Sequence, residues 1–228
     1  MLRGSGQLLL ALAETIAWQV IVGVVLFASA GAVHAPCLWT YLIVTSGMYL
    51  PAVVLIYVAS PDLLLERMKP GAGERDRLSI AALMAILLVH YVVAGLDAGR
   101  FHWSRGFPGW IVTLGLLALI FGFLISLWAM LLNRFFSSAV RLQEDRGQTV
   151  VTSGPYRVIR HPGYTGGLLF LLGSGAAPGS WVAILPMLFG IPILVRRIRI
   201  EELMLLEGLP GYREYAHRVR YRLVPGIW

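Results

Sequence analysis

The feature that most constrains this chain is a series of long apolar stretches that carry almost no charge. A helix that crosses a bilayer needs about 20 mostly apolar residues, because each residue adds about 1.5 Å and the hydrocarbon core is about 30 Å thick. A soluble core has no need of several such stretches in succession. Four stretches meet the requirement, at residues 8–32, 38–59, 78–97 and 107–132.

A fifth apolar region, residues 164–195, is interrupted near its middle by Gly173, Gly175, Pro178 and Gly179. Glycine and proline both disfavour a helix interior, so we interpret this region as two shorter helices in a hairpin that dips into the membrane. The predicted fold class is therefore all-α. It is a polytopic transmembrane helical bundle with about four spanning helices, a helical hairpin and a cytoplasmic C-terminal helix.

Composition agrees with a membrane location. Hydrophobic residues make up 57% of the chain and charged residues 14%, whereas a typical soluble domain is about 25% charged. The apolar stretch that begins at Leu8 is too long for the central region of a signal peptide, and we expect it to be a retained spanning helix. Cys37 is the sole cysteine, which excludes an intrachain disulfide and a cysteine-based metal site.

The basic residues are distributed unevenly along the chain. From Arg134 onward there are 12 arginines and six acids, and the loop at residues 60–77 carries four more basic residues, whereas residues 33–38 carry none. Arginines beside apolar helices indicate contact with lipid headgroups rather than with nucleic acid. By the positive-inside rule we expect a multi-pass membrane protein with both termini in the cytoplasm. The expected partners are the lipid bilayer and a lipophilic acceptor, with no nucleic acid.

Two short segments carry candidate chemistry, and the first is residues 152–167. Pro162 disfavours a helical conformation at His161, so this histidine is expected in a turn just before a membrane helix begins. Gly163 and two further glycines leave room for a ligand or for a neighbouring helix. The alternative interpretation is a tight interfacial turn that leads into a packing face, and the residues alone do not separate the two.

The second segment is residues 196–202. Arg197 and Glu201 are four residues apart, so they share one face of a helix at the inner end of the last apolar region. One interpretation is a surface ion pair that also anchors the helix. The other is a binding site, in which Glu201 serves a cationic or hydroxyl-bearing ligand and Arg197 holds an anionic one.

Taken together, these motifs resemble the isoprenylcysteine carboxyl methyltransferase family and the related membrane phospholipid methyltransferases. The shared pattern is a Gly-x-Tyr turn, then Arg-His-Pro-x-Tyr, a helical hairpin, Arg-x3-Glu-Glu, and a closing Tyr-x2-Tyr before Val-Pro. The resemblance covers about residues 140–228, and residues 61–67 also resemble a loop of bacterial members of the family. Its residues here are Gly154, Tyr156, Arg160, His161, Pro162, Tyr164, Arg197, Glu201, Glu202, Tyr212, Tyr215, Val224 and Pro225.

The resemblance implies a methyl donor, S-adenosyl-L-methionine, and no metal. It divides the chain into transmembrane helices 1–4 at residues 1–133 and a cofactor-binding catalytic region at residues 134–228. It gives Arg197 the acceptor carboxylate. The donor pocket that it implies, including a strand-like segment before the turn, consists of Gln148, Thr149, Val150, Val151, Tyr156, His161, Pro162, Gly163, Tyr164 and Glu201.

The implied activity is methyl transfer to a lipophilic acceptor, most simply a carboxylate of the prenylcysteine type. A carboxylate is already ionised at neutral pH, and it needs orientation rather than a base. A phospholipid amine would have to lose a proton, and Glu202 or His161 would then accept it. The main alternative is an NADPH-dependent reductase of the sterol-reductase type, which resembles the same region. In that case Arg157, Arg160 and Arg199 would meet the 2′-phosphate.

Overall fold

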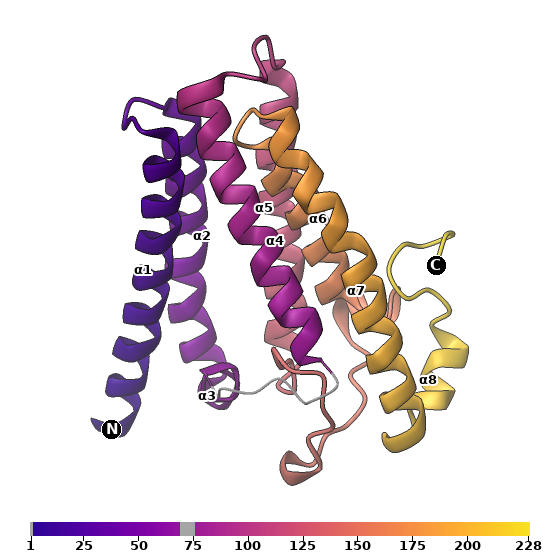
Figure 1. The fold of residues 1–228 in the computed structure, drawn as a ribbon. Helices are drawn as coiled ribbons and strands as arrows, with labels where there is room; N and C mark the ends of the chain where they lie inside the picture. Colours follow the sequence, from indigo (N-terminus) through magenta and orange to yellow (C-terminus); the bar gives the residue numbers. More distant parts are fainter. Residues whose placement is uncertain (1, 69–75) are drawn as a thin grey trace.

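The computed structural model describes residues 2–68 and 76–228, and these residues form a bundle of helices (Figure 1). A turn of π-helix, Asp97–Phe101, extends the fourth helix. The α-helices are α1 (Leu2–Ala30), α2 (Pro36–Ala59), α3 (Pro61–Met68), α4 (Arg77–Leu96), α5 (Gly109–Leu132), α6 (Pro162–Ala176), α7 (Trp181–Gly208) and α8 (Tyr212–Arg218).

Within the described ranges, five helices are long and apolar enough to cross a membrane: α1, α2, α4 with its π-helical turn, α5 and α7. The shorter α6 has 15 residues, which corresponds to a length of about 22 Å. It packs between α5 and α7. The prediction of an all-α, polytopic membrane protein is therefore confirmed.

The helices are arranged so that the two segments with candidate chemistry gather at one end of the bundle. In Figure 1, α3, α8 and the long connection from α5 to α6 lie toward the lower end, together with the N-terminus. The connections from α1 to α2 and from α6 to α7 lie at the opposite end. We call these the inner and outer ends of the bundle. Residues 133–161 form two short 3-10 turns and otherwise irregular backbone at the inner end.

The hairpin differs from its prediction in two respects. Gly173 and Gly175 lie inside α6, and the turn follows them at residues 177–180, where Gly179 has a positive φ of 74°. The second helix is not short, because α7 runs for 28 residues through Pro186 and Pro192. It continues past the apolar region into the charged turn that carries Arg197 and Glu201, so the prediction of two short helices was wrong for α7.

Two pairs of glycines explain why α5 and α6 approach so closely. A Cβ atom added to Gly122 would lie 2.5 Å from the carbonyl oxygen of Gly166, and one added to Gly173 would lie 2.5 Å from that of Gly115. Both distances are far inside van der Waals contact, so only glycine fits at these crossings. Small residues that let backbones touch are a common basis for helix association in membranes. The contact with α5 holds α6 in position in the bundle, and so it also positions the N-terminal end of α6, next to His161.

The outer half of the bundle contains a buried polar cluster. His90 is fully buried, with Nδ1 2.9 Å from the carbonyl oxygen of Ala183 and Nε2 3.3 Å from Ser174 Oγ. Ser174 Oγ also lies 2.8 Å from the Tyr41 hydroxyl. Each of these buried groups therefore has a hydrogen-bond partner, as burial in an apolar medium requires. His90 is a packed structural histidine.

The glycine contact can be tested with two adjacent residues of α6. In Gly166→Ala the new methyl group meets the Gly122 carbonyl oxygen and Ser126, whereas in Gly167→Ala nothing lies within 4 Å of it. Both substitutions gain the same helix propensity. We expect Gly166→Ala to destabilise the protein by about 1–3 kcal/mol through overpacking, and Gly167→Ala to be neutral or stabilising. Thermal unfolding in detergent measures both, and equal melting temperatures would contradict the packing described here.

Candidate active site

The inner end of the bundle encloses a cavity of about 330 Å³. Its walls come from the inner ends of α6 and α7, from α3 and from the irregular segment that follows α5. This volume is in the range of small-molecule and cofactor sites. The cavity is formed mainly by residues far apart in the sequence, from Arg67 in α3 to Tyr215 in α8.

The structure brings together nearly all of the residues that the sequence singled out. All ten residues of the predicted donor pocket line this cavity, and so does Arg197. Glu202 is different: it is 3% exposed and lies behind the wall rather than in it. Residues 148–151 line the cavity as irregular backbone, not as the strand-like segment that was expected. The cavity also takes residues from both sides of the predicted division at residue 133.

Local backbone preferences place the motif residues at the cavity wall. Pro162 occupies the first turn of α6, where its missing N–H costs nothing, and His161 is the N-cap in a non-helical conformation, with φ −124° and ψ 61°. Gly154 has a positive φ of 55°, which allows the tight turn before Tyr156. The Tyr156 hydroxyl donates to the Ala129 carbonyl oxygen at 3.3 Å, which ties this turn to α5.

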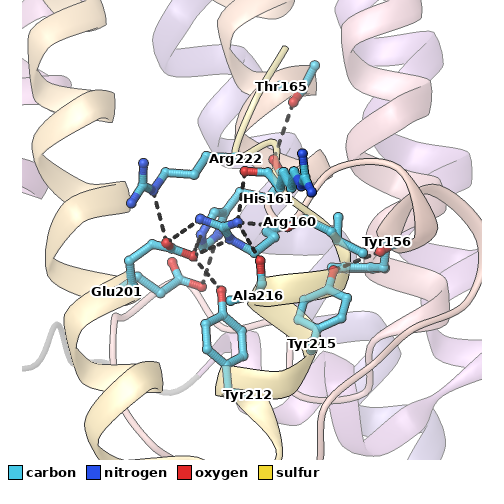
Figure 2. Close-up of polar contacts among 12 residues, drawn as sticks. Tyr156, Arg160, His161, Thr165, Glu201, Tyr212, Tyr215, Ala216 and Arg222 are labelled. Carbon is cyan, nitrogen blue, oxygen red and sulfur yellow. Dashed lines mark hydrogen bonds and ion pairs between the residues drawn. The ribbon is translucent and has the colours of Figure 1, made fainter. Parts of the chain in front are cut away.

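Glu202 is the centre of a buried polar network. Figure 2 shows its partners Arg160, His161, Tyr212 and Arg222 gathered together. Arg160 approaches its carboxylate with two nitrogens, Nε at 2.8 Å and Nη2 at 2.7 Å. The Tyr212 hydroxyl donates to it at 2.6 Å, and Arg222 Nε donates at 2.9 Å. His161 Nε2 lies 3.0 Å away. These contacts join the start of α6, the inner end of α7, α8 and the C-terminal segment.

Tyr212 and Arg160, two of the partners of Glu202, are well suited to the network. Burial and the neighbouring carboxylate raise the pKa of the Tyr212 hydroxyl, so that it remains a donor. Arg160 uses its remaining nitrogen, Nη1, on the carbonyl oxygens of Val219 at 2.7 Å and Arg220 at 3.0 Å. The two-point contact of Arg160 with the Glu202 carboxylate is charge-assisted, so it is both stronger and more directional than a single hydrogen bond.

Glu201, the next residue, faces the cavity. Its side chain is 28% exposed, and one carboxylate oxygen lies 3.8 Å from His161 Nδ1. In the part of the chain that the structure describes, Glu201 is the one carboxylate among the lining residues. The two nitrogens of the His161 ring thus face different carboxylates, Nδ1 that of Glu201 at the cavity and Nε2 that of the buried Glu202.

Arg197 has a partner that the sequence did not indicate. Its Nη2 lies 2.8 Å from Oδ2 of Asp76, which is 0% exposed, and it also donates to the Ser138 carbonyl oxygen at 2.8 Å. The guanidinium lies 5.8 Å from the centre of the Tyr164 ring. Arg197 is therefore neither a solvated anchor nor a free cation, because a buried aspartate compensates its charge.

Several lining residues were missed. Residues 135–141 form one wall, yet this irregular stretch has no periodicity that predicts such a position. Asp76, which pairs with Arg197 but does not line the cavity, was also missed, because it stands in a run of charged residues in the sequence and nothing there marks it. Arg67 belongs to the run Pro61–Arg67, which resembles a loop of bacterial family members, and that was the one available indication. Tyr212 and Tyr215 belong to the closing motif and also line the cavity.

The buried network predicts a sharp difference between two glutamates of α7. Glu202→Gln removes the charge that Arg160 and Arg222 share, and breaking a buried ion pair costs about 3–5 kcal/mol. We expect a large fall in melting temperature and loss of ligand binding at the cavity. Glu207→Gln, at an exposed position of the same helix, should change neither. Thermal unfolding of both variants in detergent tests this, and similar stabilities would contradict a central role for Glu202.

Comparison with known proteins gives matches to methyltransferases. The family model for phospholipid methyltransferase matches residues 110–209. The chain is 30% identical over 161 residues to a probable protein-S-isoprenylcysteine O-methyltransferase of Oryza sativa, an alignment that covers 65% of this chain and 83% of the relative. It is 32% identical over 146 residues to protein-S-isoprenylcysteine O-methyltransferase A of Arabidopsis thaliana, covering 62% and 70%.

Another relative is named for metal resistance rather than for methyl transfer. The chain is 32% identical over 135 residues to the cobalt-zinc-cadmium resistance protein CzcN of Cupriavidus metallidurans. The alignment covers 58% of each chain, so the match spans less than two thirds of that relative. In the described residues, no group of three or more histidine, cysteine or acidic side chains is arranged to hold a metal ion.

Proposed function

Because this chain belongs to the isoprenylcysteine O-methyltransferase family of membrane methyltransferases, we propose that it transfers a methyl group from S-adenosylmethionine to the carboxylate of a lipophilic acceptor of the prenylcysteine type. One observation carries the proposal. A single cavity at the inner end of the bundle collects every residue of the predicted donor pocket, and arginines from α3 and α7 line the same cavity.

The side chains of the cavity suit the proposed donor. When bound, S-adenosylmethionine supplies a methyl group on a positively charged sulfur. Glu201 offers a carboxylate that faces the cavity, which favours a cationic ligand. Tyr156 and Tyr164 supply aromatic surface, and the irregular backbone at residues 148–151 supplies hydrogen-bonding groups. In this proposal the protein holds and aligns two substrates, which accounts for most of the catalysis that such a displacement needs.

The arrangement around Glu202 favours a carboxylate acceptor over an amine. An amine must lose a proton, and the sequence offered Glu202 or His161 as the base. Glu202 already accepts five hydrogen bonds, counting His161, and does not line the cavity. His161 is held between two carboxylates. A carboxylate acceptor needs no base, so in this proposal Glu202 is a positioning residue rather than a catalytic one.

The arrangement of arginines does not favour the reductase alternative. That alternative assigned a 2′-phosphate of NADPH to Arg157, Arg160 and Arg199. Arg160 is fully engaged with Glu202 and backbone carbonyl oxygens. Arg157 and Arg199 are exposed and do not line the cavity. The three side chains therefore do not converge on one site.

Methyl transfer by the purified protein tests the proposal. With labelled S-adenosylmethionine and an N-acylated S-prenylcysteine, we expect labelled product that alkali hydrolyses, as it does a methyl ester. Glu201→Gln should weaken donor affinity roughly ten- to a hundredfold, because hydrogen bonds to charged groups contribute about 1.5–3 kcal/mol. The prenylcysteine amide is the control acceptor and should remain unlabelled. Alkali-stable label, or transfer only to a phospholipid amine, would contradict a carboxylate acceptor.

We further propose that the cavity and both termini face the cytoplasm. The basis is the charge distribution: arginines are dense in the segments at the inner end and sparse in the connections at the outer end. The donor would then enter from the cytoplasm. The orientation is measured by adding protease to the cytoplasmic side of sealed membranes that contain the protein with a tag at each terminus. We expect both tags to be cleaved, and a tag that is protected would refute the orientation.

A further inference from the structure

The four arginines that line the cavity differ in how their charges are compensated. Arg141 pairs with Glu66 and lies 3.3 Å from Asp145. Arg160 holds Glu202 at 2.7 Å, and Arg197 holds Asp76 at 2.8 Å. Each of these three guanidinium groups thus has at least one carboxylate partner. The fourth is Arg67, on the inner face of α3.

Arg67 has no carboxylate partner among residues 2–68 and 76–228. Its closest described interaction is with an aromatic ring, since its guanidinium lies 5.7 Å from the centre of the Phe136 ring. Burial lowers the pKa of the Arg67 guanidinium, and the nearby Tyr49 hydroxyl opposes this only in part. Arg67 is therefore a half-buried cation at the cavity wall whose charge nothing described here neutralises.

The surroundings of Arg67 are apolar on the side away from the cavity. Leu63 and Leu64 of the same helix are buried against Ile56 of α2 and Met130 of α5. Phe136 packs against the same cluster. Arg67 thus stands where the polar cavity meets the apolar contacts of α2, α3 and α5. A ligand with an anionic head and a lipophilic tail matches this boundary.

We propose that Arg67, rather than Arg197, binds the carboxylate of the acceptor. This assignment rests on the proposed function and names the residue that selects an acidic acceptor. A carboxylate beside Arg67 gains a charge partner without displacing another. A carboxylate beside Arg197 must compete with Asp76, which would then be left buried without its counter-ion, a costly state. Arg197 and Asp76 together form a neutral pair that positions the wall around Tyr164.

The planar guanidinium of Arg67 can grip a carboxylate at two points, which a lysine cannot reproduce. We therefore expect Arg67→Gln to raise the KM for an N-acylated S-prenylcysteine roughly ten- to a hundredfold, with a smaller rise in Arg67→Lys. The affinity for S-adenosylmethionine should stay within about twofold of the wild-type value, because in this assignment Arg67 contacts the acceptor and not the donor. Arg134→Gln is the matched control, because Arg134 is exposed and lies outside the cavity.

A binding measurement makes the test independent of turnover and of partial unfolding. In each variant, the affinity for the prenylcysteine acid is divided by the affinity for its amide, which has the same tail and no charge. Arg67→Gln should lower this ratio toward one, whereas Arg134→Gln should leave it at the wild-type value. Because both ligands are measured on the same preparation, a loss of folded protein does not change the ratio.

Two outcomes would overturn the assignment while leaving the proposed function in place. In the first, Arg67→Gln keeps the wild-type ratio of acid to amide affinity and the wild-type KM. Arg197→Gln instead lowers the ratio toward one and raises the KM. In the second, Arg67→Gln weakens donor binding and leaves the acceptor KM unchanged, so that Arg67 serves the donor. If the wild-type protein methylates no prenylcysteine acid at all, the proposed function itself fails, and this assignment fails with it.

Discussion

The structure of the inner end depends on the pairing of one buried carboxylate, that of Glu202. A charge in this position is stable only where donors surround it, and here Arg160, His161, Tyr212 and Arg222 do so. The need for donors around Glu202 determines the position of backbone segments as well as of side chains. It draws α8 and the C-terminal segment back onto the start of α6, where the backbone N–H groups of Arg160 and His161 donate to carbonyl oxygens of residues 221 and 222. The cavity wall is the result.

The same principle of charge compensation shapes the cavity and separates its two sides. Pairing removes three of the four lining arginines from competition for a ligand, and Glu201 is left as a carboxylate that faces inward. In the proposed reaction, a cationic donor and an anionic acceptor would then have different places to bind. Arg67 lies beside apolar residues that continue into the bundle, which suits an acceptor with a lipid tail. For the proposed reaction the protein would contribute mainly alignment, because a carboxylate acceptor needs no activation by a base.

Much of this arrangement could be predicted from the sequence, for identifiable physical reasons. The spanning helices follow from the minimum length of an apolar stretch, and the donor-pocket residues follow from motifs of distinctive order. The break between α6 and α7 includes Pro178 and Gly179 as predicted, but it was predicted to begin too early. Gly173 marks a helix contact with Gly115, which a single sequence does not distinguish from a break. Asp76 and Arg67 could not be assigned for a related reason. Asp76 pairs with Arg197, and Arg67 lies over the ring of Phe136, and both of these partners are more than 60 residues away in the chain. Among the described residues, Arg67 has no carboxylate partner.

Calorimetric titration of the purified protein measures whether this cavity binds a methyl donor. S-adenosylmethionine and NADPH are titrated separately, with Glu201→Gln as the reference variant. The account predicts saturable binding of S-adenosylmethionine that weakens in Glu201→Gln, with no binding of NADPH. Binding of NADPH in place of S-adenosylmethionine, or donor binding that is unaffected by the loss of the Glu201 charge, would contradict it.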